Sequence, residues 1–225
     1  KNLYATASAG STAIMVGDGG AILTTTNGVT WLSQTSTETV NLFGASYGGG
    51  KFVVVGDLGT ILSSPDGFAW SVQTSGTVNN LRGVSYVNGL FVAVGVNGTI
   101  LSSADGVTWT LQSSGSASEL RSAAYGAGQF VVVGDDGTIL SSTDGIVWKT
   151  QVSGIATSLL SISYAAGNFI VVGSAGVVLS STNATTWNVQ SSGTASTLRG
   201  ISYLNDQFIA IGDTGVVLSS ANGLS

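Results

Sequence analysis

Residues 81–112 read LRGVSYVNGLFVAVGVNGTILSSADGVTWTLQ, and this stretch contains the unit from which the whole chain is built. Four short runs of apolar and β-favouring residues are separated by turns rich in Gly, Asn and Asp, which is the pattern of consecutive antiparallel strands. We predict strands over 81–86, 90–94, 99–102 and 108–112, the last of which carries Trp109. The unit leaves no room for a helix.

The unit recurs every 39 residues without an insertion, and tryptophan marks each copy: Trp31, Trp70, Trp109, Trp148 and Trp187. Four strands in about 40 residues are typical of one β-propeller blade. A β-solenoid is the alternative. Along a solenoid strand, apolar and polar residues should alternate, because only one face points inward. The second strand here is instead apolar on both faces, as in Phe91-Val92-Ala93-Val94. The pattern therefore favours blades that pack against one another.

Six units, the last incomplete, account for the 225 residues. We predict an all-β fold, a six-bladed β-propeller of four-stranded blades, whose last blade lacks its outer strand. We expect a single domain over residues 1–225, with blades at about 1–40, 41–79, 80–118, 119–157, 158–196 and 197–225.

The sixth unit stops before its fourth strand, so we expect its third strand, near residues 216–218, to expose an unpaired edge. Such edges invite pairing with another chain. Three explanations remain open: the last blade has three strands, a partner or a second copy donates a strand, or the 225 residues belong to a longer chain. The second predicts a protein partner or self-association through this edge.

The composition excludes several kinds of chemistry. Cysteine and histidine are both absent, which excludes disulfides, thiolate catalysis, Ser-His-Asp triads and zinc sites that need these residues. The net charge of −5 argues against a nucleic-acid partner, and no apolar run is long enough to insert into a membrane. We expect no cofactor and no metal. The lack of cysteine and the low pI of about 4.2 suit a periplasmic or extracellular bacterial protein.

The turn before each tryptophan is the most specific motif, with Ser103-Ala104-Asp105-Gly106-Val107-Thr108-Trp109 as its clearest copy. It resembles the Asp-box (BNR) motif of bacterial sialidase-type and photosystem-II-assembly-factor-like propellers, although it is one residue shorter between Asp and Trp. The resemblance implies a propeller. The photosystem-assembly relatives imply a binding factor, and the sialidases imply glycan chemistry.

The residues of this turn have a structural explanation of their own. The Asp side chain can accept N–H bonds within its turn, Gly supplies the positive φ, and the Trp packs between neighbouring blades. Stacking of a sugar on an exposed Trp is the alternative. We expect structural roles for five tryptophans and three aspartates: Trp31, Trp70, Trp109, Trp148, Trp187, Asp66, Asp105 and Asp144.

A second set of candidates occupies one repeat position, the second residue of each first strand, which we call the strand-start position. It reads Tyr4, Phe43, Arg82, Arg121, Leu160 and Arg199, and it includes every arginine of the chain. One hypothesis is a binding collar at the channel mouth, formed by Tyr4, Phe43, Arg82, Arg121 and Arg199, because Arg suits carboxylate or phosphate groups.

Local ion pairs are the alternative to a collar. Asp135 shares a blade with Arg121, and Asp213 shares one with Arg199, at equivalent loop positions. Arg82 faces Val96 in its own blade and lacks such a partner.

These observations indicate a protein without catalytic residues. A glycosidase needs two carboxyls, one with a raised pKa, but Glu38 and Glu119 are the only glutamates and occupy unlike repeat positions. We predict a non-enzymatic protein-interaction or scaffold module that is exported. The alternative is a lectin-like propeller that binds glycans, and a glycan hydrolase is less favoured.

Overall fold

The computed structural model describes residues 1–224, which form six consecutive antiparallel sheets. The first strands of the sheets are β1 (Leu3–Ala9), β5 (Leu42–Gly48), β9 (Leu81–Val87), β13 (Leu120–Gly126), β17 (Leu159–Ala165) and β21 (Leu198–Leu204). The second strands are β2 (Thr12–Gly17), β6 (Lys51–Gly56), β10 (Leu90–Gly95), β14 (Gln129–Gly134), β18 (Asn168–Gly173) and β22 (Gln207–Gly212).

The third strands are β3 (Ile22–Thr25), β7 (Ile61–Ser64), β11 (Ile100–Ser103), β15 (Ile139–Ser142), β19 (Val178–Ser181) and β23 (Val217–Ser220). The fourth strands are β4 (Leu32–Gln34), β8 (Ser71–Gln73), β12 (Thr110–Gln112), β16 (Lys149–Gln151) and β20 (Asn188–Gln190). Four short 3-10 turns follow second strands: η1 (Asp18–Gly20), η2 (Asp57–Gly59), η3 (Ser174–Gly176) and η4 (Asp213–Gly215).

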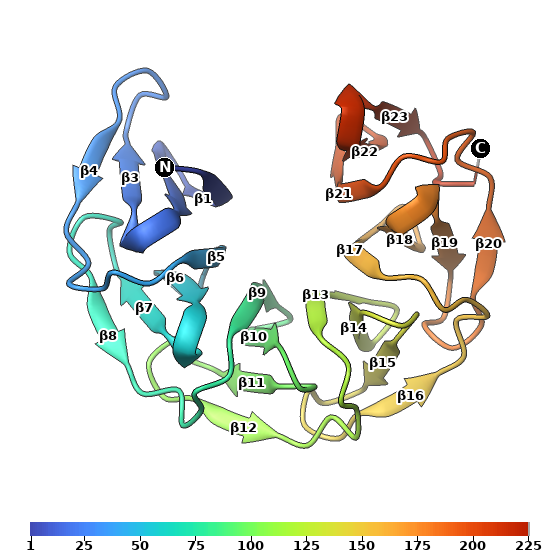
Figure 1. Cartoon of the computed structure of the whole chain (residues 1–225), viewed down its shortest axis with the longest axis horizontal. Coiled ribbons are helices and arrows are strands. Elements are labelled where there is room, and N and C mark those ends of the chain that lie inside the picture. Colours follow the sequence, from blue (N-terminus) through green and yellow to red (C-terminus); the bar gives the residue numbers. More distant parts are fainter. Residues whose placement is uncertain (225) are drawn as a thin grey trace. The chain divides into compact units, whose positions relative to one another are not determined.

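The predicted fold class is confirmed. The chain is an all-β, six-bladed propeller with five four-stranded blades and a sixth of three strands, β21-β22-β23. It divides into two compact units, Lys1–Gln112 and Ser113–Ser225, of three blades each. Within each unit the first strands of neighbouring blades contact one another, and the fourth strands form the opposite edges of the sheets (Figure 1). The single domain expected over residues 1–225 stays a prediction.

The predicted strands differ from the observed ones mainly at the fourth strand. We expected it to begin at residue 108 and to carry Trp109, but β12 begins at Thr110. The N–H of Thr108 donates to the carboxylate of Asp105 (2.8 Å), which keeps this residue in the turn and leaves Trp109 just before the strand. Leu111 of β12 is 56% exposed.

The hydrophobic core lies between neighbouring blades of the same unit. Strand β6 shows how: Phe52 and Val54 belong to a cluster with residues of blade 1, whereas Val53 and Val55 belong to a cluster with residues of blade 3. All four side chains are buried. The double-sided apolar pattern of the second strands thus arises because each strand contributes to two cores.

The glycine that ends each second strand is required by a close approach of backbone. At Gly173, a Cβ atom would lie 2.2 Å from the carbonyl oxygen of Ser158, and Gly95 and Gly134 have the same surroundings. This tight crossing lets the next N–H, that of Ser174, donate to the same carbonyl at 2.9 Å. The recurrence of Gly every 39 residues at this place follows from this geometry.

We therefore predict that Gly173→Ala destabilises the chain by about 1–3 kcal/mol, because the new methyl group overlaps a backbone atom that has no room to move. Gly200→Ala is the matched control, since a Cβ there would meet only Ile211 at 3.6 Å and serine occupies the equivalent positions 122 and 161. Chemical denaturation measures both. Equal stability of the two variants would contradict the steric explanation.

Candidate binding surface at the strand-start position

Three predicted collar residues, Tyr4, Phe43 and Arg82, lie in the first unit, and two, Arg121 and Arg199, lie in the second, where Leu160 occupies the remaining strand-start position. The two sets differ in chemistry. The first holds two aromatic rings and one cation, and the second holds two cations and one aliphatic side chain.

In the first unit the three side chains touch and form a continuous row. The rings of Tyr4 and Phe43 lie 5.4 Å apart between centroids, and the guanidinium carbon of Arg82 lies 4.7 Å from the centroid of the Phe43 ring. Tyr4 is 48% exposed, and Phe43 and Arg82 are half-buried. We call this surface the Tyr4–Phe43–Arg82 row.

Two loop carboxylates border the row. The hydroxyl of Tyr4 donates to Asp18 at 2.6 Å, and the N–H of Asn2 donates to the same carboxylate at 2.9 Å. The bond from Tyr4 is the main cause that lowers the pKa of Asp18, and it raises the pKa of Tyr4. Asp57 lies 4.0 Å from Arg82. Both carboxylates thus have partners inside the unit.

In the second unit the arginines are bound to acids of their own blades. Asp135 accepts two bonds from Arg121, at 2.7 and 2.8 Å, and Glu119 lies 3.3 Å from the same guanidinium. Arg199 likewise donates two hydrogen bonds to the carboxylate of Asp213. This bond is the main cause that lowers the pKa of Asp213. The ion pairs that we considered as the alternative to a collar are therefore present in this unit.

The pairing of Arg82 is the contact that sequence reasoning missed. Val96 stands in blade 3 where Asp135 and Asp213 stand in the blades of Arg121 and Arg199, and Phe43 stands in the blade of Asp57 where those blades have an arginine. The structure brings Arg82 and Asp57 of adjacent blades together and places Phe43 beneath the guanidinium. The sequence contained the signal, because these two departures from the repeat pattern occur in adjacent blades.

The Asp-containing turns make the hydrogen bonds that their sequence predicts. One carboxylate oxygen of Asp105 accepts the N–H groups of Val107 and Thr108, both at 2.8 Å, and the hydroxyl of Ser103 donates to it at 3.0 Å. These backbone bonds are the main cause that lowers the pKa of Asp105 to about 2. Asp66 and Asp144 each accept the equivalent two N–H groups of their own turn.

The tryptophans pack against clusters that join two blades of one unit. Trp70, Trp109 and Trp187 each lie against such a cluster, and Trp148 is only 8% exposed. The indole N–H of Trp70 donates to the carbonyl of Gly67 at 3.2 Å, and that of Trp187 donates to Ala184 at 3.3 Å. These contacts direct the rings inward. Trp31 is half-buried.

No three side chains among His, Cys, Asp and Glu converge within residues 1–224. In the same part of the chain, no helix has the length and hydrophobicity needed to cross a bilayer.

Six consecutive antiparallel sheets built from one repeat define this chain as a β-propeller of six blades. Similar solved structures include YCF48 bound to D1 peptide, with a TM-score of 0.77 and 17% identity over 98% of this chain and 78% of that one. YCF48 from Cyanidioschyzon merolae gives a TM-score of 0.72 and 16% identity over 95% and 78%, and the WD40 β-propeller domain of Doa1 gives 0.71 and 15% over 98% and 82%.

No protein-family model and no curated protein sequence matches the chain. At identities of 15–17% the structural likeness concerns the fold. It agrees with the distant resemblance to photosystem-II-assembly-factor-like propellers. The Asp-box assignment and a bacterial source stay predictions.

The hydrogen bonds of the Asp turns predict a specific dependence of stability on pH. Their carboxylates have a lower pKa in the folded chain than the usual value of about 3.9, so their stabilising effect is complete above that value and is lost as the pH falls towards about 2. We expect the melting temperature of the natural chain to fall between about pH 4 and pH 2.

The matched variant replaces Asp66, Asp105 and Asp144 by Asn. Asn183 occupies the equivalent place and already accepts the same two N–H bonds, at 3.0 and 2.9 Å. We expect this variant to fold normally at neutral pH and to lose less stability in acid. Melting curves for the two chains that run parallel from pH 7 to pH 2 would show that these carboxylates do not matter.

Proposed function

We propose that the chain is a non-enzymatic protein-interaction module and that it binds a segment of another protein on the Tyr4–Phe43–Arg82 row. The observation that carries the proposal is the contact of two aromatic rings and one guanidinium on a partly exposed surface. Aromatic residues and Arg are enriched in protein interfaces, where they supply large contact area and directed hydrogen bonds.

The fold of the neighbours supports this proposal by analogy. A propeller of similar structure, YCF48, has been solved with D1 peptide bound, and WD40 propellers such as that of Doa1 share the fold. The analogy concerns the kind of ligand, a protein segment.

The state of the carboxyl groups supports a role without catalysis. A glycan hydrolase needs a carboxylic acid whose pKa is raised, so that it can donate a proton. In the loops beside the strand-start position, the pKa values of Asp18 and Asp213 are lowered by hydrogen bonds from Tyr4 and Arg199. Both groups are thus held as carboxylates.

The environment of the indoles supports a protein rather than a glycan as ligand. Sugar stacking requires an open aromatic face, whereas Trp70, Trp109 and Trp187 pack against interblade clusters and Trp148 is buried. The lectin-like alternative would be favoured by saturable binding to a glycan array that depends on one of these indoles.

We also propose that the protein works outside the cytoplasm of a bacterium. The support is compositional: the chain has no cysteine, few charges and a pI of about 4.2. Fractionation of the source cells, with an antibody against this chain, tests the proposal. Recovery with the cytoplasmic fraction alone would refute it.

The binding proposal is tested with a displayed peptide library panned on the folded chain. We expect enriched peptides, and we expect Tyr4→Ala or Phe43→Ala to weaken the synthetic form of such a peptide by about ten-fold, because each removes aromatic contact area at the centre of the row. Fluorescence anisotropy measures the affinities.

Val72→Ala serves as the matched control, since Val72 is 53% exposed on β8 and lies at the opposite edge of its sheet from the row. It should leave the affinity unchanged. Thermal melting of all variants establishes that they are folded. The proposal fails if no peptide is enriched, or if the enriched peptides bind the Tyr4 and Phe43 variants as tightly as the natural chain.

A further inference from the structure

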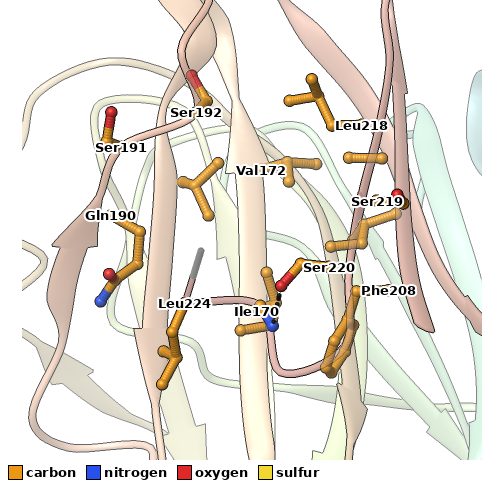
Figure 2. A pocket seen from close by; sticks show the side chains of 14 residues that line it. Ile170, Val172, Gln190, Ser191, Ser192, Phe208, Leu218, Ser219, Ser220 and Leu224 are labelled. Carbon is orange, nitrogen blue, oxygen red and sulfur yellow. Dashed lines mark hydrogen bonds between the residues drawn. The ribbon is translucent and has the colours of Figure 1, made fainter. Parts of the chain in front are cut away.

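A cavity of about 150 Å³ lies between blades 5 and 6 of the second unit, and its lining includes Ile170, Val172 and Phe208 (Figure 2). The residues 39 positions before these three belong to the cluster against which Trp187 packs. The repeat therefore accounts for this cavity as a part of the core between blades, and the cavity points to no ligand.

A groove on blade 2 of the first unit has no such explanation. It is lined by η2, by β8 and by the connector that follows β8, and its aliphatic side chains are Leu58, Val72 and Val78. Leu58 is 66% exposed and Val78 is 79% exposed. Among the described residues that line the groove, none carries a charge. The groove is thus an apolar surface that the fold leaves open to solvent.

Leu58 adopts a backbone conformation that does not favour leucine. Its φ is 55° and its ψ is 30°, in the left-handed region. A bulky apolar residue is uncommon there, whereas Gly, Asn and Asp adopt this conformation more readily. In the other blades, where φ at the equivalent position is 54–58°, the residues are Gly19, Asn97, Asp136, Ala175 and Thr214. Blade 2 therefore carries its leucine at a conformational cost.

The surrounding loop fixes the backbone of Leu58. Its N–H donates to the side-chain oxygen of Asn80 at 2.9 Å. Gly59 lies so close to the connector that a Cβ there would be 2.1 Å from the carbonyl oxygen of Thr77. These contacts hold the loop through its backbone and leave the leucine side chain exposed. The side chain is thus pre-organised, which lowers the entropic cost of binding to it.

The repeat shows that packing requires neither Leu58 nor Val78. At the position of Val78, blade 1 has Thr39 and blades 3–5 have Ala117, Ala156 and Ala195. Of the five blades that contain both positions, blade 2 alone has a branched aliphatic residue at each. An exposed apolar pair that includes a conformational outlier, and that packing does not require, indicates a binding function.

The groove continues the Tyr4–Phe43–Arg82 row. Leu58 directly follows Asp57, whose carboxylate lies 4.0 Å from the guanidinium of Arg82. The connector that carries Val78 leads into β9, which carries Arg82. Val72 lies away from the row, because β8 forms the opposite edge of the sheet β5-β6-β7-β8 from β5 (Figure 1). The end of the groove that Leu58 and Val78 form therefore adjoins the row.

We propose that the protein segment bound on the row extends over η2 and places an apolar side chain against Leu58 and Val78. The inference rests on the function proposed above and adds a second contact to it. Because the two surfaces are continuous, one segment can occupy both. Val72 lies outside the contact.

The chemistry of the second contact defines the kind of segment that fits. An aliphatic or aromatic residue, a few positions from the residue that meets Arg82, gains apolar contact with the two exposed side chains. A charged residue at that point would lose hydration without gaining a partner, because the groove carries no charge. The partner is therefore a segment with an apolar anchor beside the residues that the row binds.

The test uses the peptides that panning enriches on the folded chain, in synthetic fluorescent form. We expect these peptides to share an apolar residue at a fixed spacing from the residues that bind the row. Its replacement by Ala should weaken binding by about five- to ten-fold. Leu58→Asn and Val78→Ala should each weaken the unaltered peptide by about three- to ten-fold. Neither variant should weaken the Ala-substituted peptide further, because the contact is already lost.

Leu58→Asn separates binding from stability. Asn97 stands at the equivalent position, so the substitution gives the loop a residue suited to its backbone and should not lower the melting temperature. Ala175→Asn is the matched control, since it makes the corresponding change in blade 5 and should leave the affinity unchanged. Val78→Ala introduces the residue of blades 3–5 and should fold normally.

The possible failures are distinct. Peptides that bind Leu58→Asn and Val78→Ala as tightly as the natural chain, yet lose affinity for Phe43→Ala, would overturn the second contact and leave the row in place. A melting temperature of Leu58→Asn that falls together with its affinity would give the leucine a role in folding and would also overturn this inference alone. Peptides that depend on the groove but not on the row, or the absence of enriched peptides, would overturn both proposals.

Discussion

The burial of second strands between neighbouring sheets is the interaction on which the rest of the structure depends. A strand such as β6 contributes alternate residues to two cores, so neither of its faces meets water. Each fully buried aliphatic or aromatic side chain contributes about 1.5–3 kcal/mol, and repetition of the pattern multiplies that gain along the unit.

This constraint also decides where the sequence is free to vary. The interblade positions repeat with little change, whereas the strand-start position changes from Tyr and Phe to Arg and Leu. Variation at one position of a nearly uniform repeat means that packing does not dictate the residue there. Loop acids pair with the arginines at this position: Arg121 and Arg199 each pair with an acid of their own blade, and Arg82 pairs with an acid of the preceding blade. In the first unit, packing between blades therefore does not require the aromatic pair of Tyr4 and Phe43.

The repeat made the fold predictable, because a 39-residue period with double-sided apolar strands has few architectures. It also indicated the Asp turns, the inward tryptophans and two of the three arginine pairs. The start of the fourth strand was not predictable from alternation alone, because Thr108 is equally suited to a strand and to the turn that Asp105 holds. The stacking of Arg82 on Phe43 depends on how two blades are placed side by side, which a single repeat does not contain.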